Sequence, residues 1–193
     1  MSKAAFDLVI VGVGGQGTLL ASKILGRLAL SENCGVKVSE VHGMSQRGGS
    51  VVTYVKYGEK VYSPIVDLGE ADFILSFEAL EAARWTAYLK KGGTLITNTA
   101  EIWPMPVITG AAKYPEKIVD AVSEIVRVIP VDALSLALKT GSAKAVNIVL
   151  LGTLSKLSEI PEADWLDVIE NTVPPKFIEM NKKAFILGRE ASR

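Results

Sequence analysis

Six residues near the start of the chain, Gly12-Val13-Gly14-Gly15-Gln16-Gly17, have the composition and spacing of a phosphate-binding loop. Glycines let the backbone turn tightly and approach a ligand closely, because no Cβ stands in the way. Amide groups at the start of a following helix favour a bound anion. The loop therefore predicts a site for a phosphate-bearing ligand; the alternative is a tight turn whose glycines serve packing alone. Gln16 is expected either to bond a ligand or to cap the helix.

The segments on either side of the loop must hold it in place. Residues 8–11 form a short apolar run that predicts a buried strand, and residues 19–27 have helical spacing. A strand, a glycine-rich turn and a helix are the context that a G-x-G-x-x-G match requires. A second strand is predicted at residues 35–40, and Glu40 falls 23 positions after Gly17, close to where a dinucleotide-binding fold places its ribose-binding acid. Glu40 is therefore expected to hold a ribose or to cap a sheet edge.

A second polar, glycine-rich segment follows at residues 41–49. Its His42 lies in a loop beyond a strand, where functional residues concentrate, although a lone histidine is more often structural. Arg47 is flanked by Gln46 and two glycines, an arrangement that presents its guanidinium for a bidentate contact with a carboxylate or phosphate. The alternative for Arg47 is a salt bridge that pins the loop.

The rest of the chain predicts alternating strands and helices. The strand expected at residues 50–57 turns back into residues 61–62 with no helix between, which predicts an antiparallel hairpin at one end of the sheet. A standard Rossmann half has a helix at this point. Further strands are predicted at residues 72–77, 94–98 and 127–131, and helices at 78–89, 117–126, 132–139, 143–158, 162–171 and 175–188.

Local signals mark the ends of several of these elements. Lysines and glycines at residues 90–93 are expected to cap the helix before them. Prolines exclude residues 103–106 from a helix interior, because each removes a hydrogen-bond donor, and Asp132 is expected to cap the helix after it. The fold class expected for residues 1–193 is α/β: a single Rossmann-like domain with a mostly parallel sheet, helices on both faces, a β-hairpin excursion near residues 50–62 and a helical C-terminal third.

Composition narrows the classes of function. The 193 residues include 21 Lys and Arg against 21 Asp and Glu, so no net charge recruits nucleic acid or an anionic membrane. No apolar run approaches the ~20 residues of a membrane span, and the first strand begins almost at once, so we expect a cytoplasmic protein. The single cysteine, Cys34, is expected to be inert. It cannot form an internal disulfide or supply the several cysteines of an iron–sulfur cluster.

Catalytic motifs are missing from the sequence. It contains no G-x-S-x-G, H-E-x-x-H, P-loop lysine or Cys-x-x-Cys, and its one histidine has no evident catalytic partner. Asn147 lies in the apolar run 146–151 and is expected to be a buried, satisfied amide rather than a ligand contact. These features are typical of a binding domain without a catalytic centre of its own.

Three stretches of the sequence are similar to a known family. VGVGGQGTLLASKILG, SEVHGMSQRGGSVVTYVKYG and YSPIVDLGEADFILSFEALEA resemble the gamma-type subunit of 2-oxoacid:ferredoxin oxidoreductases, most nearly of the enzymes that act on indolepyruvate. The pair GxGGQG and HGMSQRGG at this separation is far more specific than a lone G-x-G-x-x-G. The resemblance covers about residues 6–100 with specific motifs.

The resemblance implies a role in oxidative decarboxylation of a 2-oxoacid, here an aryl pyruvate, to an acyl-CoA and CO2. Thiamine diphosphate and iron–sulfur clusters are expected on a larger catalytic subunit, electrons pass to ferredoxin, and this chain is expected to be inactive alone. Coenzyme A is the ligand implied for this chain. The residues implied near it are Gly12, Gly14, Gly15, Gln16 and Gly17 in the phosphate loop, and His42, Gln46, Arg47 and Gly48 in a facing loop at the ligand or the subunit contact.

Two other classes of function remain open from the residues. A free-standing NAD(P)-dependent oxidoreductase is suggested by G-x-G-x-x-G together with Glu40, but the predicted hairpin and the lack of a catalytic pair stand against it. The other alternative is a nucleotide-binding, sensing or structural module without catalysis.

Overall fold

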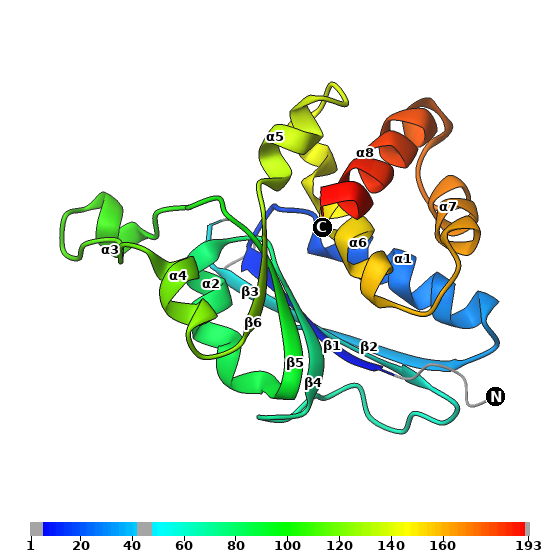
Figure 1. Ribbon diagram of the computed structural model, residues 1–193, viewed down its shortest axis with the longest axis horizontal. Helices are drawn as coiled ribbons and strands as arrows, with labels where there is room; N and C mark the ends of the chain where they lie inside the picture. The colour runs from blue at the N-terminus through cyan, green and yellow to red at the C-terminus, as the bar shows by residue number, and fades with distance from the viewer. Residues whose placement is uncertain (1–5, 42–47, 192–193) are drawn as a thin grey trace.

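The computed structural model describes residues 6–41 and 48–191. They form a three-layer α/β fold in which a six-stranded sheet separates two layers of helices (Figure 1). The strand order is β2-β3-β1-β4-β5-β6. The strands are β1 (Phe6–Val13), β2 (Gly35–Val41), β3 (Ser50–Gly58), β4 (Ala71–Ser76), β5 (Leu89–Asn98) and β6 (Arg127–Val131).

β3 is antiparallel to the other five strands. It pairs antiparallel with β1 on one side and with β2 on the other, whereas β1, β4, β5 and β6 pair parallel in that order. β2 therefore points the same way as β1, and the carboxyl ends of five strands meet at one edge of the sheet, which we call the carboxyl edge. The prediction of a mostly parallel sheet is confirmed. Ligands of open α/β sheets bind outside this edge.

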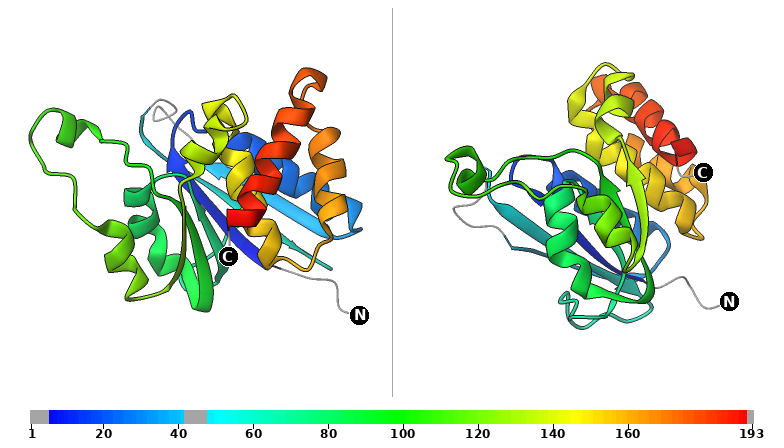
Figure 2. Two further views of the ribbon diagram at one scale, coloured as in Figure 1. Left: turned by 45° about the horizontal axis from the view of Figure 1, so that its top comes forward. Right: turned by 60° about the vertical axis from the view of Figure 1, so that its left-hand side comes forward.

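Helices cover both faces of the sheet, as predicted (Figure 2). The C-terminal helices join α1 on one face, and α2 and α4 lie on the other. The first group comprises α1 (Thr18–Ser31), α5 (Ala133–Leu138), α6 (Val146–Leu157), α7 (Glu162–Glu170) and α8 (Ile178–Ala191). The remaining helical segments are α2 (Ala79–Trp85), α3 (Met105–Ile108), α4 (Ile118–Ser123) and the 3-10 turns η2 (Thr86–Tyr88), η3 (Ala143–Ala145) and η4 (Pro175–Phe177).

β1 is buried on both faces because its side chains alternate between two cores. Leu8 and Ile10 pack under α1, α6 and α8, while Val9 and Val11 pack on the side of α2 and α4. None of the four side chains is exposed. This two-sided burial explains why the strand is a continuous apolar run rather than an alternating one.

The predicted hairpin has a different partner in the structure. β3 is antiparallel as expected, but it pairs with β2 and β1, and residues 59–70 contain no strand. Residues 61–62 provide only a two-residue segment before Pro64, which cannot compete with the seven paired residues of β2. The prediction of a strand at residues 61–62 is wrong.

Residues 90–93 extend β5 rather than capping the helix before them. That helix ends at Trp85 and continues as η2, after which Leu89 already pairs with Ala71 of β4. A Cβ on Gly93 would lie 2.9 Å from the Ala71 carbonyl oxygen, so the glycine lets the two strands approach closely. The predicted helix at 117–126 is also shorter, because Lys117 has a positive φ of 53° and α4 begins after it.

Within residues 6–41 and 48–191, no helix combines the length and the apolar composition needed to cross a membrane.

Candidate functional site

The glycine loop connects the carboxyl end of β1 to the start of α1. Gly15 has a φ of +101° and Gly17, the N-cap of α1, has a φ of +86°. L-residues rarely adopt this left-handed region, so glycine is required at both positions. The Gly14 amide donates to the Gly49 carbonyl at 2.9 Å, which ties the loop to the segment before β3.

Gln16 braces the loop from inside. Its Oε1 accepts a hydrogen bond from the Val13 amide at 2.7 Å, and its Nε2 donates to the Phe77 carbonyl at 2.9 Å. A Cβ on Gly12 would lie 2.7 Å from Gln16 Oε1 and 2.9 Å from Phe77 Cβ. Gly12 therefore makes room for this brace, and both ends of the Gln16 amide are bonded to backbone at the ends of β1 and β4.

Asn147 holds the other side of the loop. It is 3% exposed, its Nδ2 donates to the Gly17 carbonyl at 3.2 Å, and its Oδ1 accepts from the Ile148 amide at 2.9 Å. The prediction of a buried, satisfied amide is confirmed. Because Asn147 lies in the first turn of α6, the C-terminal helices contribute directly to positioning the glycine loop.

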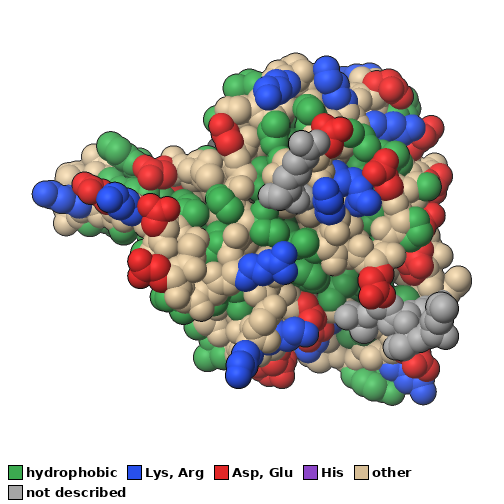
Figure 3. All heavy atoms as spheres, in the orientation of Figure 1, with side chains coloured by type: hydrophobic (Ala, Val, Ile, Leu, Met, Phe, Trp, Pro, Cys, Tyr) green, Lys and Arg blue, Asp and Glu red, His purple; other side chains and the backbone are tan. Residues whose placement is uncertain are grey.

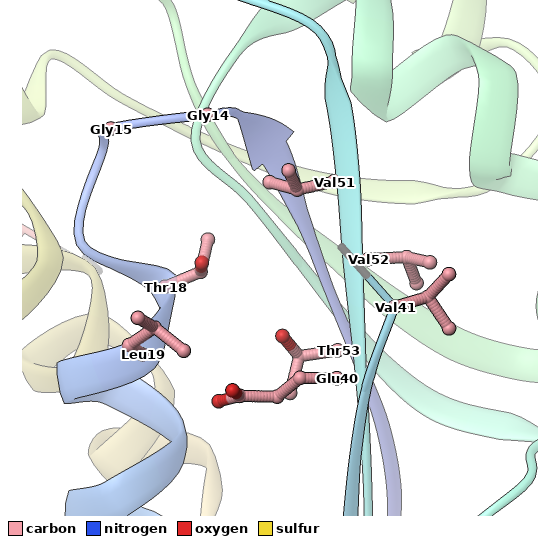
Figure 4. Close-up of a pocket in the computed structure, with 9 residues that line it drawn as sticks. All are labelled: Gly14, Gly15, Thr18, Leu19, Glu40, Val41, Val51, Val52 and Thr53. Carbon is pink, nitrogen blue, oxygen red and sulfur yellow. The ribbon is translucent and has the colours of Figure 1, made fainter. Parts of the chain in front are cut away.

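A pocket of about 240 Å³ lies between the first turn of α1, the end of β2 and the start of β3 (Figure 4). Glu40 and Thr53 extend into it from the strands, and Thr18 faces them from the helix (Figure 4). The Glu40 carboxylate accepts a hydrogen bond from Ser22 Oγ at 2.7 Å, which fixes its direction. The lining residues are Gly14, Gly15, Thr18, Leu19, Glu40, Val41, Val51, Val52 and Thr53.

The direction of β2 brings Glu40 to this pocket. Since β3 opposes both β1 and β2, the end of β2 and the glycine loop share the carboxyl edge. In a dinucleotide-binding fold, the strand that carries the ribose-binding acid lies directly beside β1. Here β3 intervenes, which moves Glu40 outward by one strand spacing of about 4.8 Å.

The start of α1 leaves amide groups available to a ligand. No described residue accepts a hydrogen bond from the Gly15 or Gly17 amide, and α1 begins without a side-chain cap. By contrast, α2 and α5 begin with Glu78 and Asp132, whose carboxylates accept from the Glu81 and Ser135 amides. Uncapped amides at the positive end of a helix dipole form an anion site.

The lining therefore offers surfaces suited to three kinds of group. A phosphate fits the amides at the start of α1, hydroxyl groups fit the Glu40 carboxylate, and an apolar portion fits Leu19, Val41 and Val51. The lining residues include no histidine, cysteine or lysine, and their one carboxylate is that of Glu40. Among the residues that the structure describes, no group of three or more His, Cys, Asp or Glu could hold a metal ion.

The structure separates the residues predicted for the two loops. Gly14 and Gly15 line the pocket, whereas Gly12, Gln16 and Gly17 shape the loop around it. Gly48 lines a smaller cavity of about 80 Å³ beside α2. The other facing-loop residues, His42, Gln46 and Arg47, lie outside the described residues.

Sequence reasoning missed three polar residues that form or support the pocket. Thr18 follows the last loop glycine, and Ser22 lies four residues later on the same face of α1. Along β3, the side chain of Thr53 points to the opposite face of the sheet from those of Val52 and Tyr54. The helical period after the loop could have identified Thr18 and Ser22, whereas Thr53 required knowledge of which strand lies beside β1.

A Rossmann-like sheet with an uncapped helix and a pocket at its carboxyl edge is typical of a ligand-binding domain. Residues 7–191 match the family described as Pyruvate ferredoxin/flavodoxin oxidoreductase. The chain belongs to this family, which confirms the resemblance of its motifs.

Relatives give the same assignment, and solved structures share the fold. The chain is 45% identical to indolepyruvate oxidoreductase subunit IorB of Thermococcus kodakarensis, over 97% of this chain and 96% of that one. Its fold matches pyruvate oxidoreductase subunit PORC from Thermotoga maritima with a TM-score of 0.74 at 21% identity, over 97% of each chain. It also matches 2-oxoglutarate:ferredoxin oxidoreductase from Magnetococcus marinus, solved with 2-oxoglutarate, coenzyme A and succinyl-CoA bound, with a TM-score of 0.74 at 19% identity. That match covers 98% of this chain and 31% of that one.

Proposed function

We propose that the chain is the small, non-catalytic subunit of an indolepyruvate-type 2-oxoacid:ferredoxin oxidoreductase. The complex converts an aryl pyruvate and coenzyme A to an acyl-CoA and CO2 and passes the electrons to ferredoxin. The role of this chain is to bind a phosphate-bearing part of coenzyme A at the start of α1. The uncapped start of α1 beside Glu40, in the pocket at the carboxyl edge, is the observation that carries this proposal.

The chemistry of the pocket fits a nucleotide portion of coenzyme A. The Gly15 and Gly17 amides suit a phosphate, and Glu40, held by Ser22, suits a ribose hydroxyl. A close negative charge at Glu40 would repel a phosphate, so the phosphate belongs at the helix start and the sugar at the strand. The relative from Magnetococcus marinus was solved with coenzyme A, which supports this class of ligand.

The size of the pocket supports a shared site. Pockets that bury a whole small molecule measure about 300–1,000 Å³, and this pocket measures about 240 Å³. Coenzyme A is therefore held here by one portion only, and the thiol end extends to the catalytic subunit. Such a division explains why this chain needs its partner.

The chemical step belongs to the partner in this proposal. Thiamine diphosphate supplies carbanion stabilisation when bound, and iron–sulfur clusters carry the electrons. We assign both to the larger subunit because clusters are held by several cysteines and this sequence has only Cys34. The complex is assigned to the cytoplasm, where ferredoxin is its electron acceptor.

Activity of the separated and combined subunits tests the proposal. The chain alone should reduce no dye with indolepyruvate and coenzyme A, whereas co-expression with the larger subunit should give activity that requires both substrates. Pyruvate and 2-oxoglutarate serve as controls for the aryl side chain. Turnover by this chain alone would contradict the proposal.

An NAD(P)-binding oxidoreductase is the second candidate. Glu40 at the same edge as the glycine loop favours it, and the insertion of β3 beside β1 stands against it. Calorimetric titration of the complex with NADH and with coenzyme A separates the two. Micromolar binding of NADH without binding of coenzyme A would favour this second candidate.

A further inference from the structure

Residues 99–117 form an arm that projects from the body between β5 and α4 (Figures 1 and 2). It contains a single helical turn, α3, in which Pro106 occupies the first turn. Trp103, Met105 and Ile108 are 56%, 65% and 61% exposed, and none belongs to either hydrophobic core. The arm thus presents large apolar side chains that lie outside both hydrophobic cores. Figure 3 shows hydrophobic side chains on the projecting arm beside charged ones.

The base of the arm is fixed by one buried carboxylate. Glu78 is 1% exposed, and its Oε1 accepts hydrogen bonds from the Ile102 amide at 3.1 Å and from the Tyr114 hydroxyl. Both ends of the arm therefore converge on one oxygen atom. Burial and the bond to Glu78 raise the pKa of Tyr114, so that its hydroxyl stays protonated and donating. The Ala79 amide adds a bond to the Ala100 carbonyl at 3.1 Å.

A second buried carboxylate connects this base to the glycine loop. Glu81 is 2% exposed and accepts from Ser50 Oγ and from the Arg84 guanidinium. Ser50 follows Gly49, whose carbonyl accepts from the Gly14 amide. The arm is thereby held at the carboxyl edge, in a fixed relation to the pocket. Burying two carboxylates is costly unless they are well bonded, so the arm is a built feature and not a loose loop.

The chemistry of the arm indicates a protein partner. It carries two lysines and two glutamates, so its net charge is zero and it offers no attraction for nucleic acid or an anionic lipid surface. Exposed Trp and Met are enriched where proteins bind each other. In the Magnetococcus marinus enzyme this fold makes up 31% of a longer chain, so the fold there adjoins further protein.

We propose that the arm is the element that docks this chain onto the larger catalytic subunit, with Trp103, Met105 and Ile108 seated in an apolar groove of that subunit. The proposal rests on the proposed function for the identity of the partner. It places the subunit contact beside the carboxyl edge, where a ligand shared between the two chains has to pass.

A variant of the arm surface tests the docking. The triple variant Trp103→Ala, Met105→Ser, Ile108→Ser is co-expressed with a tagged larger subunit, and the dissociation constant of the complex is measured by mass photometry over a dilution series. We expect the complex to dissociate at least about 100-fold more readily, because buried aromatic anchors dominate such interfaces. The circular dichroism spectrum should stay unchanged, since these side chains are exposed.

The matched control removes exposed apolar side chains elsewhere. Ile125, Leu134 and Leu138 are 76%, 41% and 58% exposed, and Ile125→Ser, Leu134→Ser, Leu138→Ser should change the dissociation constant less than two-fold. Equal constants for the arm variant and the wild type would overturn the inference. So would loss of a dimer of this chain with no change in subunit affinity.

Two further outcomes separate this inference from the proposed function. If the arm variant keeps normal indolepyruvate-dependent dye reduction and unchanged affinity for the larger subunit, the docking role of the arm is contradicted and the proposed function is not. A wild-type chain that never associates with the larger subunit would contradict the proposed function as well.

The hydrogen bonds that Glu78 accepts at the base of the arm provide a second test. The Glu78 carboxylate accepts a hydrogen bond from the Glu81 backbone amide, and Glu78→Gln replaces it with a side-chain amide. The base of the arm should therefore loosen, and cleavage by protease within residues 99–117 should accelerate. Glu101→Gln, an exposed substitution of the same kind on the arm, is the control. Equal cleavage rates for the two variants would contradict the claim that Glu78 fixes the base of the arm.

Discussion

Gly152 and Gly188 lie where α6 contacts α8, whereas Gly15 lies in the loop between β1 and α1. A methyl group on Gly152 or Gly188 would overlap the backbone of the opposite helix, at Phe185 or Val149. A methyl group on Gly15 would meet nothing within 4 Å. The two helical glycines are there because space is lacking, and the loop glycine is there because its φ requires it. Only the second arrangement leaves backbone accessible to a ligand.

The largest effect is expected at the contact between α6 and α8. Gly188→Ala puts a Cβ into the Val149 carbonyl, so the helices must separate, and the free energy of unfolding should fall by about 3 kcal/mol or more. Gly26→Ala in α1 is the control, because its Cβ would meet only Val38 Cγ2 of β2, at 3.9 Å. That variant should be unchanged or stabilised by up to about 1 kcal/mol. Urea denaturation measures both, and equal losses would contradict the packing argument.

The next effect concerns the internal brace of the loop. Gln16→Met keeps the volume of the side chain but removes the acceptor of the Val13 amide and one donor to the Phe77 carbonyl. Asn98 Nδ2 still donates to the Phe77 carbonyl, so the main consequence is that the Val13 backbone amide loses its partner. The free energy of unfolding should fall by about 1–3 kcal/mol. A Gln16→Met chain as stable as the wild type would show that water replaces the brace.

A smaller effect is expected for the open loop glycine. Gly15→Ala has only the left-handed backbone conformation to overcome, which costs about 1–2 kcal/mol. Gly92→Ala is the matched control, since Gly92 has a φ of +82°, equally open surroundings and a position away from the pocket. Thermal unfolding should show similar losses for the two variants. A much larger loss in Gly15→Ala would mean that the loop is packed rather than open.

The smallest effect concerns a capped helix that starts at the same edge. Hydrogen bonds from Ser135 hold the pKa of Asp132 below its ordinary value. A carboxyl whose pKa is lower in the folded state stabilises the fold above its unfolded pKa and loses this contribution as pH falls through the folded pKa. Asp132→Ala should therefore cost about 1 kcal/mol at pH 7, and the difference from wild type should shrink below about pH 4. Denaturation at pH 7 and pH 3 checks this; a constant difference would contradict it.

The sequence predicted the elements that depend on local patterns. The buried run at residues 8–11, the glycine loop and the cap at Asp132 are readable because each depends on neighbours in the chain. The partner of β3 was not readable, because residues 35–41 and 50–58 pair over a distance that hydrophobic alternation alone does not specify.

The candidate site was predicted in part for the same reason. The loop residues were identified, but the bonds of Gln16 to β4 and of Asn147 to Gly17 join segments that are far apart in the sequence. The prolines at 104 and 106 correctly excluded a helix interior. They gave no sign that both ends of the arm would converge on Glu78.

The central claim is that the open start of α1 holds a phosphate-bearing part of coenzyme A. The most direct measurement is calorimetric titration of the complex with coenzyme A, for the wild type, Gly15→Ala and Gly92→Ala. Gly15→Ala should weaken binding at least about ten-fold because Gly15 lines the pocket beside the uncapped start of α1, and Gly92→Ala should leave it within two-fold. Equal affinities in all three proteins would contradict the claim.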